Sequence, residues 1–186
     1  ADRLKPVRVR RLERAARGGQ PANALHRSQG RLRSPGGPDL AALYEATEVP
    51  FDCEQAFAVV ADIERYPEFV PRYRASRILD RGDGTLTVEQ AVAWGGLTFR
   101  FRSRAELEPP RAIHIHSADL PFRELAIHWL FQPAGTGCRV TFRMRYRLAL
   151  PGLAVAAAPM VRGPVRETLA AFRNRVWHLY GVAGKG

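Results

Sequence analysis

Apolar and polar side chains alternate through the middle of the chain, and this alternation constrains the fold more than any other feature. In five successive segments between residues 86 and 148, apolar residues recur at every second position, and arginines fill many of the positions between them. In the last segment, Val140, Phe142 and Met144 alternate with Arg143 and Arg145. A period of two is that of a β-strand, so the pattern predicts a sheet with one apolar and one polar face.

Short turn signals separate these segments and indicate how the strands are connected. Gly, Pro and Asp cluster at 81–84, 95–96, 108–111, 119–122 and 133–137. Connections of this length join neighbouring antiparallel strands. The sequence therefore predicts one antiparallel sheet.

The segment in front of the sheet predicts a strand followed by a helix. Residues 40–49 are expected to form the first strand. Asp52 is a candidate N-cap, with Gln55 three residues later in the position of a capping box, so a short helix is expected to follow. Pro67 is expected to push Tyr66 out of the α region and to end that helix.

A long helix is predicted near the end of the chain, from about residue 153 to residue 180. Its apolar residues recur at spacings of three and four along one face, at Val165, Leu169, Phe172, Val176 and Leu179. Gly163 and Pro164 are expected to kink this helix or to divide it from a first turn at 153–161. Because this helix is the only large element available to cover the apolar face, we expect an α+β fold in which the sheet curves around it.

A curved sheet and a single helix need not close at both ends, so an apolar cavity between them is expected. Its candidate lining residues are Val92, Trp94, Phe99, Phe101, Ile115, Trp129, Phe142, Met144, Val161 and Leu169. Each of them alone is better explained as ordinary core, but as a set they fit a site for an apolar molecule. Gln90, Ser103 and Ser117 are the polar exceptions on this face, and they are candidates for contacting a carbonyl or hydroxyl group.

Basic residues are concentrated at the start of the chain. The net charge is +11, and residues 1–38 hold ten basic and two acidic side chains, or +8. Such a charge favours anionic partners, either nucleic acid or an acidic membrane surface. The arginines expected to make these contacts are Arg8, Arg10, Arg11, Arg14, Arg100, Arg102, Arg143 and Arg145. The leading segment resembles a mitochondrial transit peptide, would serve equally as an arm on RNA, and is most simply a disordered basic tail.

Little in the sequence indicates catalysis or metal binding. His114, His116 and His128 fall on the polar face of the sheet, where a solvated histidine is expected more often than a base. Cys53 and Cys138 lack metal-ligand spacing, and we expect buried free thiols in a reducing compartment rather than a disulfide. No nucleophile motif or phosphate-binding glycine loop is present, and no apolar run approaches the roughly 18–20 residues needed to cross a bilayer. We therefore expect no catalytic residue, no metal and no cofactor.

Three stretches carry a resemblance to a known family: VADIERYPEFVP (60–71), LEPPRAIHIHSADLPFRELAIHWLF (107–131) and CRVTFRMRY (138–146). Together with the order of elements they resemble the START-like, helix-grip superfamily. Within it they are similar to the coenzyme Q-binding branch, which is also labelled polyketide cyclase/dehydrase and includes the ribosome-association toxin proteins. The resemblance extends over about residues 42–176 and leaves residues 1–38 without a counterpart.

The resemblance implies a non-enzymatic protein that binds ubiquinone or a related isoprenoid lipid and supports respiratory electron transfer. It places the gate of the cavity at an elbow formed by Tyr66, Pro67, Phe69, Val70 and Pro71. The next residue, Arg72, departs from the family, in which this position is often tryptophan. The arginines on the outer face of the last strand also stand where relatives often carry acids.

Two parts of the chain are expected: an arginine-rich tail or targeting remnant at 1–38 and a START-like lipid-binding domain at 39–182. The expected partners are an isoprenoid quinone or lipid, an anionic membrane surface or respiratory complex, and the ribosome or its RNA. The expected location is the inner-membrane face of the mitochondrial matrix, with the bacterial cytoplasm as the alternative. Two other functions stay open: a ribosome-binding factor that works through its basic surface and, with less support, an aromatase/cyclase.

Overall fold

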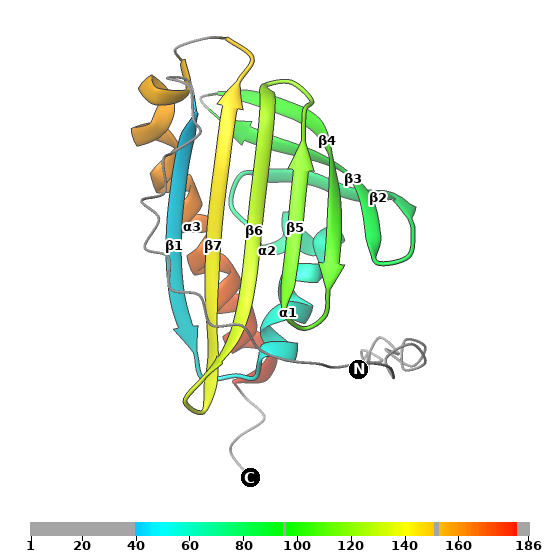
Figure 1. Ribbon diagram of the computed structural model, residues 1–186, viewed down its shortest axis with the longest axis vertical. Coiled ribbons are helices and arrows are strands. Elements are labelled where there is room, and N and C mark those ends of the chain that lie inside the picture. Colours follow the sequence, from blue (N-terminus) through cyan, green and yellow to red (C-terminus); the bar gives the residue numbers. More distant parts are fainter. Residues whose placement is uncertain (1–39, 95, 151–152, 182–186) are drawn as a thin grey trace, which may run out of the picture. The chain divides into compact units, whose positions relative to one another are not determined.

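The computed structural model describes residues 40–94, 96–150 and 153–181. The predictions for the arginine-rich tail, including the roles of Arg8, Arg10, Arg11 and Arg14, lie outside the described residues and stay predictions. The described elements run from a strand through short helices and six further strands to a long helix (Figure 1).

Seven antiparallel strands form the sheet in the described part of the chain. They are β1 (Ala41–Val49), β2 (Tyr73–Arg81), β3 (Thr85–Trp94), β4 (Leu97–Glu108), β5 (Ala112–Ser117), β6 (Phe122–Ala134) and β7 (Gly137–Leu148). Their order across the sheet is β1-β7-β6-β5-β4-β3-β2, so β2 to β7 pair as successive hairpins and β1 adds to the free edge of β7. The predicted antiparallel sheet and the predicted first strand are confirmed.

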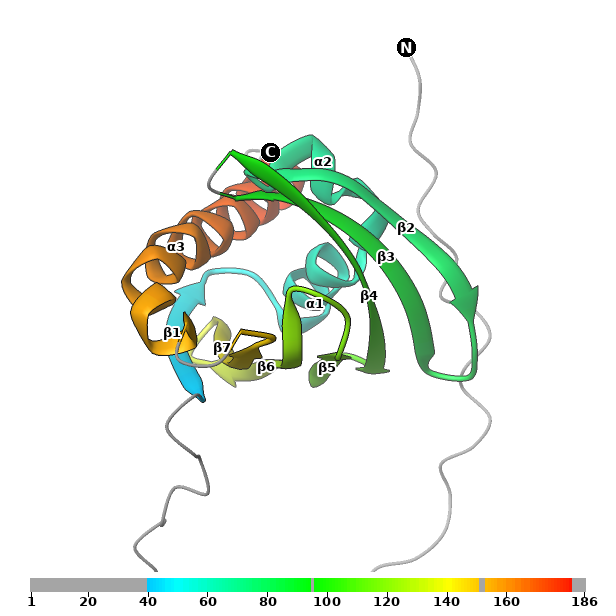
Figure 2. The same cartoon turned by 90° about the horizontal axis from the view of Figure 1, so that it is seen from above.

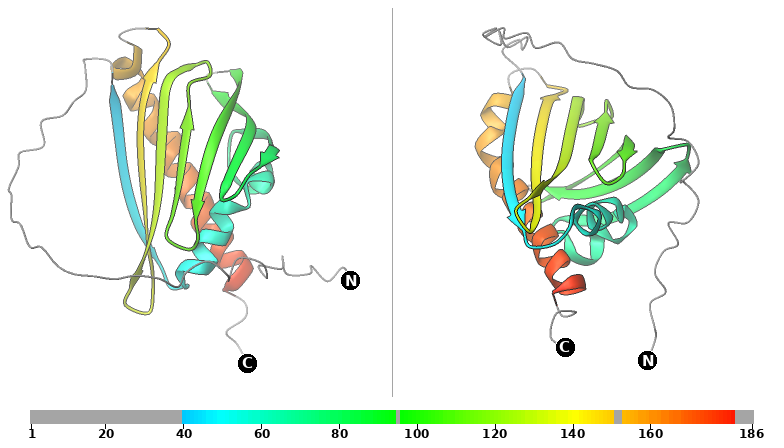
Figure 3. Two further views of the ribbon diagram at one scale, coloured as in Figure 1. Left: turned by 45° about the vertical axis from the view of Figure 1, so that its right-hand side comes forward. Right: turned by 60° about the horizontal axis from the view of Figure 1, so that its bottom comes forward.

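The sheet curves around helix α3 (Leu153–Tyr180), which crosses its concave face (Figures 2 and 3). Phe172 of α3 is buried, and its ring centroid lies 5.1 Å from that of Trp129 on β6. Trp129 in turn packs edge-on against Phe142 of β7, at 4.9 Å between ring centroids. These aromatic contacts join the helix to the sheet, and the predicted α+β, helix-grip fold is confirmed.

Helix α1 (Cys53–Ala61) begins at the predicted cap. The Gln55 backbone N–H donates to Asp52 Oδ1 at 2.7 Å, and the Asp52 N–H donates to Gln55 Oε1 at 3.2 Å. These reciprocal bonds satisfy two backbone donors at a helix start, where no helical acceptor is available. The cap fixes the point at which the chain turns from β1 into the helix.

The prediction that Pro67 ends this helix was wrong. Helix α1 ends at Ala61, a 3-10 turn η1 (Ile63–Arg65) follows, and Pro67 lies in the first turn of helix α2 (Tyr66–Phe69). Tyr66 has helical dihedral angles, with φ −52° and ψ −40°. A backbone N–H in the first turn needs no helical acceptor, so proline is tolerated there and its fixed φ favours a helix start.

Helix α3 is continuous, so the predicted division at Gly163 and Pro164 was wrong, whereas the alternative of a kink stays a prediction. Proline costs a helix interior about 3 kcal/mol. Burying large apolar side chains such as Val165 and Phe172 contributes about 1.5–3 kcal/mol each. The packing of α3 on the sheet therefore outweighs the local cost of Pro164.

Cys53 and Cys138 form a disulfide, so the prediction of free thiols was wrong. Cys138 lies opposite Val49 in the pairing of β1 with β7, and Cys53 is the first residue of the helix that follows β1. The turn after β1 carries Cys53 back over β7 and brings the two Cα atoms to 5.1 Å. The cysteines are 85 residues apart in the chain, and only the pairing of the first strand with the last makes them neighbours.

Candidate functional site

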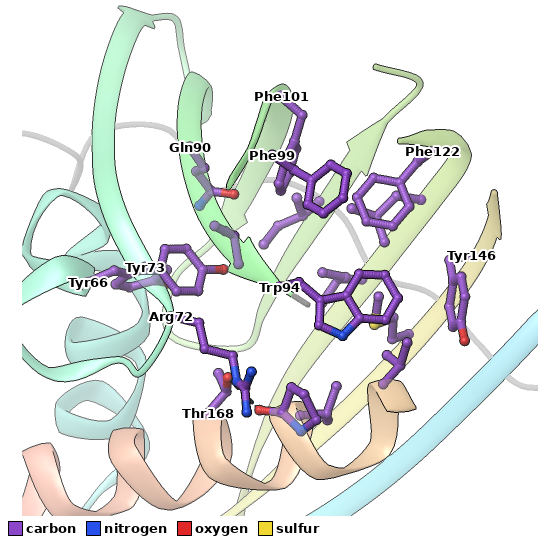
Figure 4. A pocket seen from close by; sticks show the side chains of 18 of the residues that line it. Tyr66, Arg72, Tyr73, Gln90, Trp94, Phe99, Phe101, Phe122, Tyr146 and Thr168 are labelled. Atoms are coloured by element: carbon purple, nitrogen blue, oxygen red, sulfur yellow. Dashed lines mark hydrogen bonds between the residues drawn. The ribbon is translucent and has the colours of Figure 1, made fainter. Parts of the chain in front are cut away.

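An apolar cavity of about 190 Å³ lies between the concave face of the sheet, the elbow and helix α3 (Figure 4). Every described strand except β1 contributes to its wall. The predicted cavity and gate residues that line it are Tyr66, Pro71, Val92, Trp94, Phe99, Phe101, Ile115, Trp129, Phe142, Met144 and Val161. Their role in binding a ligand stays a prediction.

The predicted residues that do not line this cavity are Pro67, Phe69, Val70 and Leu169. Val70 is buried in the core, the Phe69 ring packs against Phe172 at 5.3 Å, and Pro67 is exposed. Leu169 lines a separate hollow of about 20 Å³ between α3, β1 and β7. The elbow contributes only its two ends to the cavity wall, and its role as a gate stays a prediction.

Aromatic rings from three strands form one wall of the cavity. The ring centroids of Trp94, at the end of β3, and Phe99, near the start of β4, are 6.3 Å apart. The ring centroid of Phe101 on β4 lies 5.5 Å from that of Phe122, the first residue of β6. Phe122 was missed from the sequence because its segment, 119–122, carries a strong turn signal. The alternation of β4 turns its phenylalanines toward the cavity and its arginines away.

Tyr73 of β2 and Gln90 of β3 face these rings from the opposite side of the cavity (Figure 4). Gln90 is only 8% exposed, and no described residue forms a hydrogen bond with its side-chain amide or with the Tyr73 hydroxyl. Burial raises the pKa of Tyr73 to about 12, so its hydroxyl is protonated at neutral pH. Both donors lie on the cavity wall without a partner, and a ligand oxygen between them would accept a hydrogen bond from each.

Of the predicted polar exceptions, only Gln90 lines the cavity. Ser103 is buried outside the lining, and the Ser117 hydroxyl donates to the backbone carbonyl of Arg102. Tyr73 was missed from the sequence. It opens β2, where a register shift follows directly and interrupts the alternation that identified the other strands.

Arg72 connects the elbow to helix α3 at the edge of the cavity. Its backbone lies in the left-handed region, with φ 72°, and its carbonyl accepts the Ala93 N–H at 2.8 Å. Its guanidinium Nε donates to Glu167 Oε2 at 3.1 Å. The positive charge at the cavity wall is therefore paired with a carboxylate of α3 rather than left for a ligand.

The lining of the cavity includes no histidine, aspartate or glutamate. Its titratable side chains are Arg72 and the tyrosines Tyr66, Tyr73 and Tyr146, and burial raises the pKa of each tyrosine. The Tyr66 hydroxyl donates to the backbone carbonyl of Val60. General acid–base catalysis works best with a group whose pKa is near the working pH, and none of these side chains has one.

The convex face of the sheet carries the predicted surface arginines Arg100, Arg102, Arg143 and Arg145, all of them exposed. The Arg102 guanidinium lies 3.7 Å from the Glu89 carboxylate, and the Arg143 guanidinium lies 5.7 Å from the centroid of the Tyr44 ring. Arg143 and Arg145 form no ion pair with any carboxylate of the described ranges. This face therefore presents net positive charge beside an exposed aromatic ring.

Histidines gather at the centre of this convex face. His114 and His128 are opposite residues of β5 and β6, and their Nδ1 atoms are 2.7 Å apart. The ring centroids of His116 and His128 are 5.9 Å apart. Burial, followed by the neighbouring His114, His116, Arg145 and Arg143, lowers the pKa of His128. His114 and His128 are half-buried and in contact, which the sequence did not indicate, and the expectation that the histidines are not catalytic bases stays a prediction.

None of the described helices is long and apolar enough to cross a bilayer. The described residues also hold no group of three or more histidines, cysteines or acids that could bind a metal ion. The expectations of no metal and no cofactor stay predictions.

The chain therefore combines the helix-grip fold with an apolar cavity on the concave face of its sheet. The chain belongs to the family described as polyketide cyclase/dehydrase and lipid transport, which it matches over residues 49–173. That description covers both enzymes and carriers.

Two relatives have names that bear on function. The ribosome association toxin RatA of Pseudomonas aeruginosa is 31% identical over 134 residues, which cover 72% of this chain and 93% of that protein. The mitochondrial coenzyme Q-binding protein COQ10 homolog B of Xenopus laevis is 24% identical over 142 residues, or 74% of this chain and 58% of that protein. Both coarse predictions, of the coenzyme Q-binding branch and of kinship with ribosome-association toxins, agree with these names.

Solved structures share the fold. An 18 kDa protein from Caulobacter crescentus is 27% identical with a TM-score of 0.64, over 76% of this chain and 99% of that chain. The Zhui aromatase/cyclase of a Streptomyces species is 16% identical with a TM-score of 0.69, over 78% of this chain and 99% of that chain. At that identity the second likeness concerns the fold alone.

Proposed function

We propose that the protein binds and carries an isoprenoid quinone, such as coenzyme Q, or a similar apolar lipid, without converting it chemically. The observation that carries this proposal is the arrangement of the cavity, in which aromatic rings face the free donors of Tyr73 and Gln90. Apolar walls with a few placed polar groups are typical of small-molecule sites. A quinone ring has flat apolar faces that match the aromatic wall, and its carbonyl oxygens would accept hydrogen bonds from Tyr73 and Gln90.

The size of the cavity limits how much of a ligand it encloses. In another protein an engineered apolar cavity of about 150 Å³ binds benzene, whereas pockets for whole drug-sized ligands measure about 300–1,000 Å³. The cavity of about 190 Å³ therefore encloses a substituted ring or one end of a lipid. The rest of an isoprenoid chain would leave through the mouth.

The chemistry of the wall favours a carrier over a cyclase. A cyclase has to hold an acid or base against its substrate, and the lining offers tyrosines with raised pKa, an amide and a paired arginine. These groups orient a carbonyl, but they do not exchange protons readily at neutral pH. Aromatase/cyclase activity is therefore the weaker proposal.

The names of the relatives support two locations for such a carrier. The Xenopus relative is named for coenzyme Q binding and as mitochondrial, which supports a role in respiratory electron transfer at the matrix face of the inner membrane. The relatives named RatA are bacterial, which supports the bacterial cytoplasm as the alternative.

Binding of a short-chain ubiquinone to the purified protein tests the proposal. Trp94 and Trp129 line the cavity, so a bound quinone should quench tryptophan fluorescence to saturation. Phe101→Asp and Phe99→Asp should abolish the quenching, because an unpaired charge in an apolar cavity is costly. The matched control, Arg100→Asp, changes an exposed neighbour and should bind like wild type. Circular dichroism would verify folding, and saturable binding by both folded phenylalanine variants would refute the proposal.

A second candidate function, association with the ribosome, is favoured by the convex face together with the relatives named for that property. Arg143 lies against Tyr44, and Arg145 lies in one row with His116 across β7, β6 and β5, all four on exposed positions. Arginines bind phosphate oxygens and aromatic rings stack on bases, so this face is suited to RNA.

Co-sedimentation with ribosomal subunits at increasing salt tests this second candidate. Arg143→Glu combined with Arg145→Glu should lower binding and reduce the salt dependence, by about 0.7–0.9 in log K per log salt for each lost phosphate contact. The same variant should bind quinone like wild type. Phe101→Asp should lose quinone binding and sediment with ribosomal subunits like wild type. Sedimentation no better than that of an unrelated basic protein would exclude ribosome association.

A further inference from the structure

We propose that the mouth of the cavity docks on an anionic lipid bilayer, and that three leucines at its edge insert among the acyl chains. The proposal rests on the proposed carrier function and adds the surface through which the ligand enters and leaves. The leucines are Leu97, Leu120 and Leu150, which we call the leucine rim. They are 63%, 71% and 66% exposed, more than any other large apolar side chain of the described residues.

The leucine rim belongs to three connections at one end of the sheet, β3–β4, β5–β6 and β7–α3 (Figure 1). In an antiparallel sheet these connections necessarily lie at the same end. The cavity opens toward them: Trp94 and Phe122, which line it at this end, are partly exposed, whereas Trp129 and Phe142 are buried. The most exposed leucines therefore border the opening of the apolar cavity.

Backbone and side-chain hydrogen bonds hold two of these loops in place. The Ala149 N–H donates to the Pro121 carbonyl at 2.9 Å and so ties the β7–α3 connection to the β5–β6 loop. Asp119 Oδ2 accepts the Arg102 N–H at 2.9 Å, which ties the β5–β6 loop to β4. These bonds hold the residues on both sides of Leu120 in place and so fix its backbone at this end of the sheet.

Arginines stand just behind the leucine rim. Arg100 and Arg123 each follow a rim leucine by three residues, and Arg162 lies beside the cavity residue Val161 on α3. All three are exposed, and none forms an ion pair with a carboxylate of the described ranges. Leu97 and Arg100 are three residues apart on strand β4, or about 10 Å, and interfacial apolar groups lie about 5–10 Å deep in a bilayer. An inserted Leu97 would therefore place Arg100 at the level of the lipid phosphates.

The size of the cavity gives a second reason to choose a bilayer as the occupant. It encloses one end of an isoprenoid lipid, so the remaining chain crosses the leucine rim on its way out. A docked bilayer would receive that chain directly and spare it contact with water. A basic rim also favours acidic lipids over neutral ones.

Flotation with vesicles tests the docking surface, using phosphatidylcholine alone and phosphatidylcholine mixed with phosphatidylserine. The wild-type protein should bind the mixed vesicles more strongly. Leu97→Ser combined with Leu120→Ser should reduce partitioning into vesicles at least tenfold. Arg100→Gln combined with Arg123→Gln should reduce partitioning about tenfold or more, and only on acidic vesicles. The matched control is Leu79→Ser on β2, a leucine that is 38% exposed and does not border the cavity.

Quenching by brominated lipids gives an independent readout of orientation. Trp94 lies at the cavity mouth, whereas Trp177, which is 49% exposed, lies at the end of α3. Brominated acidic vesicles should quench the Trp177→Phe variant about as strongly as wild type and quench Trp94→Phe much less. The reverse pattern would show docking by another face and would overturn the proposal.

The outcomes separate this proposal from the proposed function. If the rim variants still bind soluble short-chain ubiquinone but lose vesicle binding, both stand. If ubiquinone binds and the rim variants float like wild type, the docking surface is wrong and the carrier function stands. If neither wild type nor variants bind ubiquinone, the carrier function fails, whatever the vesicles show. If the rim instead binds a protein, vesicle binding is unchanged by its substitution and the proposal fails.

Discussion

Arg72 and Glu167 form an ion pair between the elbow and helix α3, with Nε of the arginine 3.1 Å from Oε2 of the glutamate. Both side chains are more than a third exposed, at 37% and 49%. Such a pair contributes less than about 1 kcal/mol to stability because solvent screens it. Its position matters more, since it joins two walls of the cavity that are separate in the chain.

We expect loss of this ion pair to accelerate ligand exchange with little change in stability. Glu167→Gln should raise the dissociation rate of a bound quinone several-fold and change the free energy of unfolding by less than about 1 kcal/mol. Stopped-flow quenching and urea denaturation measure the two quantities. The exchanged pair, Arg72→Glu with Glu167→Arg, should restore slow release if the ion pair holds the walls together. Equal release rates in all three proteins would contradict this role.

The Tyr73 hydroxyl should contribute to ligand binding as a donor. Tyr73→Phe is expected to weaken binding of a short-chain ubiquinone by about 0.5–1.5 kcal/mol, or roughly two- to tenfold. Binding of an isoprenoid hydrocarbon without a carbonyl should not change, which provides the control. Because the pKa of Tyr73 is raised to about 12, the wild-type affinity should stay constant between about pH 6 and 9. A decline across that range would contradict the assignment.

Most of the sheet could be predicted from the sequence, because one face of β3 to β7 is buried and the other is exposed to solvent, so apolar and polar residues alternate along these strands. Strand β2 was missed, because its pattern is interrupted by two register shifts and most of its residues are exposed. The elbow was also misjudged, since Pro67 can end one helix or start the next, and the chain around it decides between them.

The cavity residues could be predicted only within strands in which apolar and polar residues alternate. Trp94, Phe99 and Phe101 follow from strand periodicity, and the cavity includes all three. Tyr73 and Phe122 begin strands next to turns, where a period of two has not yet been established. The disulfide between Cys53 and Cys138 and the contact between two histidines depend on pairing between distant segments, which no local pattern contains.

The disulfide should stabilise the domain substantially. Replacing both cysteines by alanine is expected to lower the free energy of unfolding by about 2–5 kcal/mol, because the bond closes a long loop in the unfolded chain. Urea denaturation with and without a reducing agent provides the measurement. Wild type should approach the double variant when reduced, and the double variant should not respond to the reductant. Identical curves for oxidised and reduced wild type would show that the bond does not contribute.

Protonation of His128 should destabilise the fold in mild acid. Burial and the neighbouring His114, His116, Arg145 and Arg143 hold its folded-state pKa below the ordinary value of 6.5. As pH falls through 6.5 and then through the lower folded-state pKa, the unfolded chain takes up this proton before the folded chain does. The free energy of unfolding should therefore be highest above about pH 7 and decline below it. Denaturation between about pH 5 and 8 should show a shallower decline in His128→Gln, and an equal or steeper one would contradict this.

Native mass spectrometry of the purified protein, followed by organic extraction, tests the carrier function most directly. Protein expressed in cells that make isoprenoid quinone should carry one apolar molecule with a carbonyl-bearing ring, and Phe101→Asp should carry none. The extract should be recovered in roughly equal amounts from wild type and from the control Leu79→Ser, which changes a residue outside both the cavity and the leucine rim. Wild-type protein that is empty after purification, and that stays empty after incubation with ubiquinone, would contradict the account.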